Sequence, residues 1–480
     1  MRTSEGNQAW RDTAWRDLGS IAAAQSVMLR DVGLFDDSVL AALLTALDGI
    51  NRATPPSVQH LSELIATHEE RLDALTPAGV VGAASIGRAR NDTSAALARL
   101  ADRTHLLTSL EAMSQLRRAL LDLAVEHITT LLPAYSGSQA MQPTTFAHTL
   151  GGLLGPLGRI SIRLQSAFAD LNQSPLGALS LTSSGLSIDR EGVAALLGFV
   201  EPIAHTFDAV AAIDPYVTTF DALAALAAAI RRWLEELLSW IRTDPHSFRF
   251  TAAWRVPGAE PQSPQFNPPS GVQRLIISCR QTESAAGGLT ALLHAAPYGP
   301  IESTIDAIYN MTAALFGDIN TILESMRDLV SGGLTPNRAA LANRAGKEFT
   351  TVGDLADLLM LEETLDPAAA RAIAALAVTN AQSQGLEVTG ITPEIVDASA
   401  LLVIGRELGL EAERLGRHLA PRRFVERRTA PGAPSPVAMR RYLSEERERV
   451  KLAHSWLTST KEDLAAAAAT LAASTQIEAT

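Results

Sequence analysis

Apolar residues recur at helical spacing along nearly the whole chain. Four segments carry long amphipathic patterns, with apolar positions three and four residues apart: 106–133, 143–173, 221–243 and 302–333. We expect Pro133 to close the first of these helices, and Gly332 and Gly333 to end the last. Long helices joined by compact loops are typical of elongated bundles. The pattern therefore predicts an all-α protein built around a bundle of long helices.

Two segments interrupt this helical pattern. "LPAYSGSQAMQPTTF" (132–146) is predicted to be the junction between the first two long helices, with Pro143 in the first turn of the second. Segment 254–271 is rich in Pro and Gly and is predicted to be an extended loop. From Ser444 the chain is charged and then rich in Ala, which predicts a surface helix.

The length of 480 residues suits about two or three domains. We expect an N-terminal helical domain (1–92), a central long-helix domain (93–345) and a C-terminal helical domain (346–480). Hydrophobic residues make up 47% and aromatic residues only 5%, a composition that favours packed helices over sheets.

The charge and the composition exclude several classes of partner. The formal net charge is −12 and no basic stripe is visible, which argues against a nucleic-acid partner. The single cysteine, Cys279, excludes an intramolecular disulfide and a cysteine-rich metal site. Residues 1–17 lack the apolar core of a signal peptide, and the most apolar stretch, 220–230, is too short to span a bilayer. We therefore expect a cytoplasmic protein without a membrane partner, metal or cofactor.

Several specific motifs occur in a fixed order. They are "GRARNDTSAALARL" (87–100), "QPTTFAHTL" (142–150), "NQSPLGALSLTSSGLSIDREGVAALLGF" (172–199), "FTTVGDLADLLM" (349–360) and "RRTAPGAPSP" (427–436). From about residue 16 to residue 443, the order of segments resembles the argininosuccinate lyase branch of the aspartase/fumarase superfamily. The resemblance implies three helical domains, a homotetramer that pools its central helices, and active sites that each draw segments from three subunits. It also implies a small-molecule substrate.

The sequence departs from this family where the chemistry is expected. The family breaks a C–N bond by removing a proton next to a carboxylate, which requires an acid, a base and cations. Its Thr-His pair reads Ser136–Gly137 here, so the proton-transfer side chain is missing. The serine and lysine of its Gly-Ser-Ser-x-x-Pro-x-Lys-x-Asn-Pro loop have no counterpart, and 254–271 contains no lysine. Two further family lysines fall on Pro300 and Asp306.

The remaining polar and apolar residues near the expected site supply the candidates. The acid–base candidates are Tyr298, Glu260 and Asp306. The substrate-binding candidates are Arg88, Arg90, Asn91, Tyr135, Ser136, Gln142, Ile213 and Phe266. Asn91 and Asp92 have an alternative role as helix caps, and His148 is interpreted as a packing residue.

These replacements indicate a changed substrate. A dicarboxylate that enters an apolar pocket without counter-charges loses hydration at a cost of several kcal/mol. The leading hypothesis is a repurposed enzyme that carries out a cyclisation, isomerisation or elimination on a relatively apolar small molecule of specialised metabolism. It would not cleave argininosuccinate. The alternatives are a non-catalytic structural or regulatory homologue and, less favoured, an ordinary argininosuccinate lyase.

Overall fold

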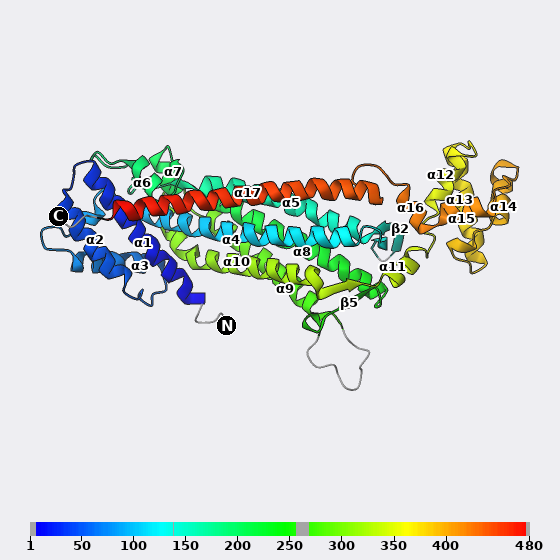
Figure 1. Cartoon of the computed structure of the whole chain (residues 1–480), viewed down its shortest axis with the longest axis horizontal. Coiled ribbons are helices and arrows are strands. Elements are labelled where there is room, and N and C mark those ends of the chain that lie inside the picture. Colours follow the sequence, from blue (N-terminus) through cyan, green and yellow to red (C-terminus); the bar gives the residue numbers. More distant parts are fainter. Residues whose placement is uncertain (1–5, 138, 256–267, 477–480) are drawn as a thin grey trace, which may run out of the picture.

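The computed structural model describes residues 6–137, 139–255 and 268–476, and the fold is all-α. A bundle of long helices forms the body of the molecule and runs along its longest axis (Figure 1). These helices are α4 (Arg90–Glu126), α5 (Phe146–Leu171), α8 (Asp214–Thr243), α9 (Ser270–His294), α10 (Glu302–Asp328) and α17 (Pro436–Ser474). Helices α4, α5, α8 and α10 correspond to the four predicted long segments, although α4 and α8 begin 16 and 7 residues earlier than the periodicity indicated. Helix α17 begins 8 residues before the surface helix predicted from Ser444, and α9 was not among the predicted segments.

Local signals explain where several of these helices begin. The Thr145 hydroxyl caps α5 by accepting a hydrogen bond from the His148 amide, and Ser435 caps α17 in the same way. Proline occupies the first turn of α8 and of α17, where its missing N–H costs nothing. At the end of α10, Gly332 adopts a φ of 138° within a π-helical turn (Leu329–Gly333), as the glycine pair predicted.

Shorter helices cover the two ends of the bundle (Figure 1). One end carries α1 (Gly6–Asp31), α2 (Asp37–Asn51), α3 (Leu61–Leu75), the 3-10 turn η1 (Ala83–Ser85), α6 (Arg190–Leu196) and α7 (Thr206–Ala211). The other end carries α11 (Arg338–Ala345), α12 (Gly353–Leu361), α13 (Pro367–Ser383), η4 (Val388–Gly390), α14 (Pro393–Ile404), α15 (Ala412–Leu419) and α16 (Pro421–Glu426). A further 3-10 turn, η2 (Ala252–Trp254), precedes α9.

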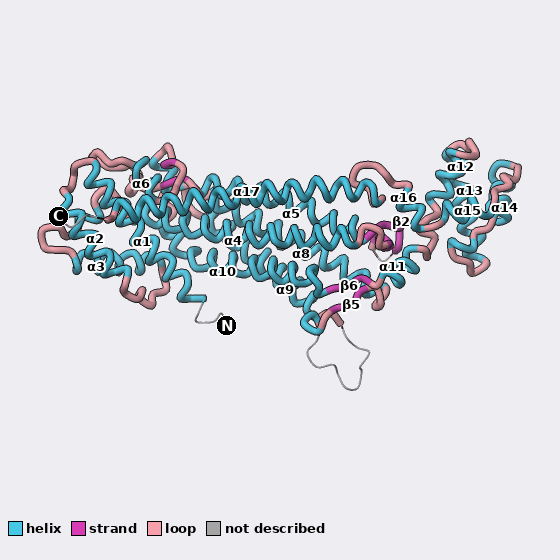
Figure 2. Tube along the Cα trace, in the orientation of Figure 1, coloured by secondary structure: helices cyan, strands magenta, loops and turns pink. Residues whose placement is uncertain are grey.

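Three small two-stranded sheets join the helices (Figure 2). They pair β1 (Leu131–Ser136) with β2 (Gln139–Thr145), β3 (Gln173–Ser174) with β4 (Glu201–Pro202), and β5 (Phe248–Phe250) with β6 (Leu334–Pro336). The β3–β4 pair is parallel and the other two are antiparallel. Strands this short hold neighbouring loops together and contribute little to the hydrophobic core.

The β1–β2 hairpin corrects the prediction of a helix that continues to Pro133. Helix α4 ends at Glu126, and the chain turns at Gly137 before α5 begins at Phe146. Pro133 lies opposite Pro143 in the hairpin. Neither residue has a backbone N–H, so neither leaves a hydrogen-bond donor unpaired at this position of the ladder. Gly137 has a φ of 60°, in the left-handed region that glycine adopts readily. The two prolines therefore belong to strands, and the hairpin projects from the end of α4.

Two large cores and one small cluster of buried residues stabilise the described chain. The larger core runs through the bundle and includes side chains of α17 such as Met439, Leu443, Val450 and Leu457. The smaller core collects only residues between Leu355 and Leu419. Helix α17 thus packs on α4 and α5, although the three-domain division expected from the sequence grouped it with 346–435. That division remains a prediction, and the buried side chains associate α17 with the central helices.

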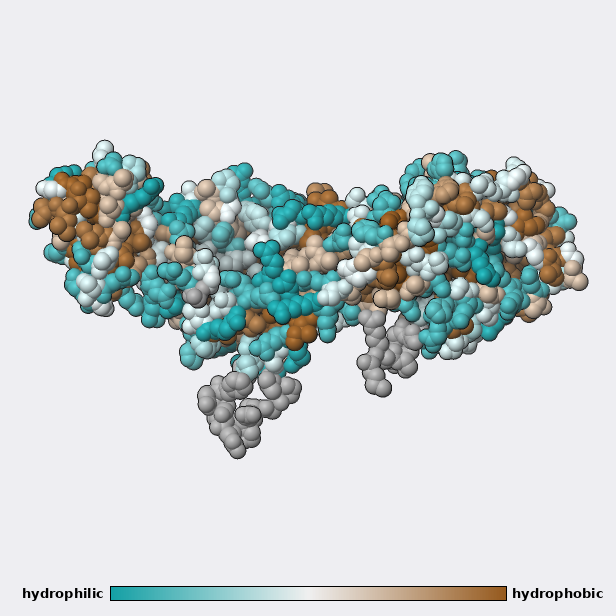
Figure 3. Space-filling view, turned by 180° about the vertical axis from the view of Figure 1, so that it is seen from behind, coloured by the Kyte–Doolittle hydropathy of each residue, from teal (hydrophilic) through white to brown (hydrophobic). Residues whose placement is uncertain are grey.

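The surface is mixed, with one conspicuous apolar end. Figure 3 shows apolar side chains gathered where α12 to α14 form the tip of the molecule. Leu361, Leu401 and Leu402 are exposed there by 82%, 52% and 75%. None of the described helices combines the length and apolar character needed to cross a membrane.

Candidate functional site

The first turn of α4 carries the motif that includes Arg90, Asn91 and Asp92. The buried Asp92 carboxylate accepts the Ala89 amide at 2.8 Å and so caps the helix. The Asn91 amide donates to the Ser180 carbonyl at 2.9 Å. The Arg90 side chain is exposed beside these bonds. This polar motif therefore serves largely to connect the helix to the neighbouring loop, while Arg90 faces outward.

Arg88, the other candidate cation of this motif, is buried. Its side chain is only 2% exposed, and its Nη2 atom lies 4.0 Å from Glu69 Oε1. Its Nε and Nη1 atoms have no partner among the described residues. Burial lowers the pKa of Arg88, and burial together with Arg88 lowers the pKa of His68 to about 3. Of the two arginines, only Arg90 presents its charge at the surface.

Three further candidates lie towards the same end of the bundle. The Tyr298 side chain is 84% exposed, and its ring stacks on Phe207 with centroids 5.2 Å apart. Asp306, on the first turns of α10, accepts hydrogen bonds from the Ser62 amide at 2.7 Å and hydroxyl at 3.1 Å. Ile213 is half-buried directly before α8 and packs on the main core. Asp306 therefore links α10 to α3, which is a structural use of a residue predicted to be catalytic.

The hairpin candidates lie at the opposite end of the bundle (Figure 1). Ser136 and Gln142 are exposed, and Tyr135 is half-buried. The Tyr135 hydroxyl accepts a hydrogen bond from Arg344 Nε at 3.4 Å, and Arg344 also pairs with Glu348. Those bonds raise the pKa of Arg344, so this end carries a permanent cation. Sequence reasoning missed Arg344 because it lies 209 residues from Tyr135 and in no recognisable motif.

His148 lies next to the hairpin and is held by it. One ring nitrogen, Nδ1, is 2.8 Å from the Thr144 hydroxyl, and the backbone of Gly432 provides a second hydrogen bond. Burial lowers the pKa of His148, so the imidazole is neutral near pH 7. These contacts agree with the interpretation of His148 as a packing residue.

A single chain does not bring these candidates together. Helix α4 has 37 residues and spans about 55 Å, and it separates the Arg90 group from the hairpin group. Glu260 and Phe266 lie outside the described residues. Within one subunit the structure brings Arg90, Asn91, Ile213, Tyr298 and Asp306 to one end, and Tyr135, Ser136 and Gln142 to the other.

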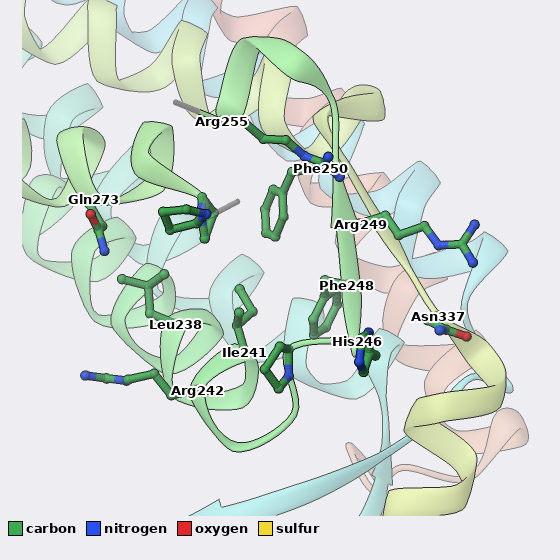
Figure 4. A pocket seen from close by; sticks show the side chains of 13 residues that line it. Leu238, Ile241, Arg242, His246, Phe248, Arg249, Phe250, Arg255, Gln273 and Asn337 are labelled. Atoms are coloured by element: carbon green, nitrogen blue, oxygen red, sulfur yellow. The ribbon is translucent and has the colours of Figure 1, made fainter. Parts of the chain in front are cut away.

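A cavity of about 700 Å³ opens at the end of α8 (Figure 4). Its lining includes Leu238, Ile241, Phe248 and Phe250, together with Gln273 from the start of α9. Phe250 points into the cavity, whereas the guanidinium of Arg249 extends to the other side of β5. The lining also includes Arg242, His246, Arg255 and Asn337, so the cavity is mixed in character, and none of the described site candidates lines it.

Groups of three or more His, Cys, Asp or Glu side chains that could hold a metal ion are absent from the described part of the chain.

Comparison with known proteins gives concordant matches. The profile of the lyase family matches residues 36–253. An argininosuccinate lyase of Methanoculleus marisnigri is 29% identical over 445 residues, covering 91% of this chain and 87% of the relative. Argininosuccinate lyase 2 of Agrobacterium fabrum is 28% identical over 430 residues, covering 88% of this chain and 84% of the relative. A crystal structure of EDDS lyase in complex with formate superposes with a TM-score of 0.83 at 25% identity, covering 97% and 92% of the two chains.

Over most of its length the chain is similar to lyases of the aspartase/fumarase superfamily. The similarity supports a function of the lyase family and agrees with the long-helix bundle. It leaves the substrate open, since fold alone does not determine function.

Proposed function

We propose that the protein is a repurposed enzyme on an argininosuccinate-lyase-like scaffold, and that it does not cleave argininosuccinate. Its substrate would be a relatively apolar small molecule with one anionic end. The reaction would be a cyclisation, isomerisation or elimination in specialised metabolism. The matches to argininosuccinate lyases and to EDDS lyase support the general lyase chemistry of this proposal.

The observation that carries the proposal is the Ser136–Gly137 turn. The resemblance assigns a proton-transferring histidine to position 137, and glycine has no side chain that could titrate. The left-handed φ of 60° at this residue fits glycine and disfavours a β-substituted residue. The turn therefore suits glycine, and the groups that it can contribute to a reaction are the Ser136 hydroxyl and the backbone.

The charges at the opposite end support a substrate with fewer anionic groups. Arg90 is exposed, while Arg88 is buried beside Glu69. A single available guanidinium suits a single carboxylate, for which a charge-assisted hydrogen bond contributes about 1.5–3 kcal/mol. A dicarboxylate would leave its second charge without a comparable partner at this end.

The complete site would form between subunits of a homotetramer. About 55 Å of α4 separates the Arg90 group from the hairpin, so an antiparallel neighbour is needed to bring one subunit's hairpin to another's Arg90. Light scattering should give a mass four times the 50.9 kDa of the chain. A monomer at micromolar concentration would contradict this part of the proposal.

A non-catalytic role is the second candidate, and one observation favours it. The Asp306 carboxylate is bound by Ser62, and the Tyr298 ring is stacked on Phe207. Acid–base candidates that already have structural partners are less available for chemistry. A structural or regulatory homologue would bind no ligand through Arg90.

Ligand binding to the purified protein distinguishes these proposals. Cinnamate and fumarate share a trans-propenoate end, but cinnamate replaces the second carboxylate with an apolar ring. Calorimetry should show tighter binding of cinnamate, weakened about ten- to a hundredfold by Arg90→Ala. Arg52→Ala, an exposed arginine in α2's C-terminal flank, is the matched control and should have no effect. Tighter binding of fumarate favours an ordinary lyase, and no binding of either favours the non-catalytic role.

A further inference from the structure

A second cavity lies between α1, α4 and α10 and is distinct from the candidate site. Its volume is about 670 Å³, which is typical of small-molecule sites. Its lining consists of Ala9, Trp10, Thr13, Ala101, Asp102, His105, Tyr309, Asn310, Met311, Ala313, Ala314, Gly317 and Asp318. Asp102 is 12 residues beyond Arg90 on α4, a separation of about 18 Å. None of the motifs that carry the family resemblance includes the cavity's polar residues.

The cavity has an unusual concentration of buried polar groups without partners. Asp102 is 4% exposed, and its carboxylate accepts no hydrogen bond and forms no ion pair with any described residue. The Nε1 atom of Trp10 and the hydroxyl of Tyr309 are also buried and unpartnered within the described chain. An unsatisfied buried polar group costs about 1–3 kcal/mol. Two unpartnered groups and a carboxylate without a hydrogen bond among the described residues line this cavity, which indicates that something else completes their interactions.

The nearby arginines do not neutralise Asp102 by direct contact. Arg99 donates to the Asp170 carbonyl at 2.7 Å, and Arg103 donates to the Asn172 side chain at 2.8 Å. Burial raises the pKa of Asp102 to about 8, and Arg99 only partly opposes this effect. A bound cation would stabilise the ionised carboxylate in this position. Among the described residues, therefore, no positively charged side chain contacts this buried acid.

The aromatic walls suit the same kind of ligand. The rings of Trp10 and Tyr309 meet edge to face, with centroids 5.9 Å apart. Aromatic faces attract cations, most strongly where water is excluded. His105 stacks on Phe316, and burial lowers its pKa, so its imidazole is neutral and does not repel a cation. The lining combines two acids, Asp102 and Asp318, with two aromatic rings and a neutral imidazole, and this combination favours a positively charged ligand with an apolar body.

We propose that this cavity is a second ligand site, which binds a small organic ammonium ion. Its charge would meet the Asp102 carboxylate, and its apolar body would contact Trp10, Tyr309 and the alanines of α4 and α10. The site is independent of the proposed substrate site at Arg90, so either can be tested without the other.

Benzylammonium is a suitable probe, with benzyl alcohol and benzoate as uncharged and anionic counterparts of the same size. Calorimetry on the full-length protein should show benzylammonium binding at least tenfold more tightly than benzyl alcohol, with no binding of benzoate. Asp102→Asn should weaken benzylammonium binding by tenfold or more. Asp122→Asn changes an exposed acid of the same helix and should leave binding unchanged. Arg90→Ala should also leave it unchanged.

A second variant keeps the test decisive if Asp102→Asn does not fold. Met311 is 43% exposed at the cavity, so Met311→Trp should fill the opening without disturbing the core. We expect this variant to lose benzylammonium binding while retaining its thermal unfolding temperature. Absence of benzylammonium binding at millimolar concentration, equal binding of benzyl alcohol, or unchanged binding in either variant would overturn the proposal. Waters alone in a structure grown with benzylammonium would overturn it as well.

Discussion

Helix α4 carries two buried aspartates whose surroundings differ sharply. Asp92, in the first turn, accepts backbone N–H groups of Ala89, Gly177 and Leu179 at 2.8, 3.1 and 2.8 Å. Asp102, three turns further on, accepts none among the described residues and borders a cavity. Burial raises the pKa of both, but the three amides counteract the effect only at Asp92. The buried Asp92 carboxylate therefore holds the surrounding backbone in place, whereas the buried Asp102 carboxylate remains available to a ligand.

Asp92→Ala should have the largest effect, because it leaves three backbone donors without an acceptor. We expect the free energy of unfolding to fall by about 3–5 kcal/mol, measured by urea titration. Asp122→Ala, on the exposed face of α4, should change it by less than about 0.5 kcal/mol. Equal losses in the two variants would remove the distinction drawn for Asp92.

Asp102→Asn should act in the opposite direction and depend on pH. The folded-state pKa of about 8 lies above the ordinary aspartate pKa of 3.8, so the unfolded chain loses this proton first. Stability is therefore lost as the pH rises from about 4 to about 8, and Asn avoids that loss. We expect the variant to be more stable than the natural protein by about 1–3 kcal/mol near pH 8, and nearly equal near pH 4.

Urea titration at the two pH values measures this difference. Burial also raises the pKa of Asp17, to about 6, and this lowers stability with rising pH in the variant and the natural protein alike. In the natural protein, Arg99 partly opposes the rise in the pKa of Asp102. A variant that is destabilised at both pH values would show that the Asp102 carboxylate has a structural partner.

Asn91→Ala should have a moderate effect beside Asp92. Loss of the hydrogen bond to the Ser180 carbonyl should lower the free energy of unfolding by about 0.5–1.5 kcal/mol. Cinnamate affinity should change less than threefold if this amide only fixes the loop. A loss of tenfold or more would assign Asn91 to the substrate pocket and restore its predicted binding role.

Gly137→Ala should have the smallest effect. The left-handed φ of 60° disfavours alanine by about 1 kcal/mol, although no described atom lies within 4 Å of the added methyl group. Gly137→Asn should cost less, because asparagine adopts this conformation more readily. Thermal unfolding measures both. A destabilisation of several kcal/mol would show that the turn is packed rather than exposed.

The sequence predicted the helices well because their apolar periodicity extends over many turns. It failed at the β1–β2 hairpin, where Pro133 and Pro143 were assigned to helix ends and instead face each other in strands. Proline is common both at helix ends and in hairpin strands at the edge of a sheet, so the local sequence pattern did not distinguish the two. The alternative role of Asn91 and Asp92 at a helix start agrees with the structure, in which α4 begins at Arg90 and the Asp92 carboxylate accepts the Ala89 amide.

The electrostatic roles could not be predicted from sequence. Arg88 and Arg90 are two residues apart, yet Arg88 is buried in the loop that precedes α4, whereas Arg90 is the exposed first residue of the helix. Likewise, the Asp306 bond to Ser62 joins residues 244 apart, and the Arg344 bond to Tyr135 joins residues 209 apart. Such partners depend on tertiary packing, which one sequence does not specify.

A turnover assay measures whether this protein cleaves argininosuccinate, which we propose it does not. Purified protein would be incubated with argininosuccinate, and fumarate release would be followed by ultraviolet absorbance. We expect no release above the uncatalysed background, and no rescue by Gly137→His, because catalytic groups act as a unit. Release at the rate of an ordinary enzyme, about 1–10 per second or more, would contradict it.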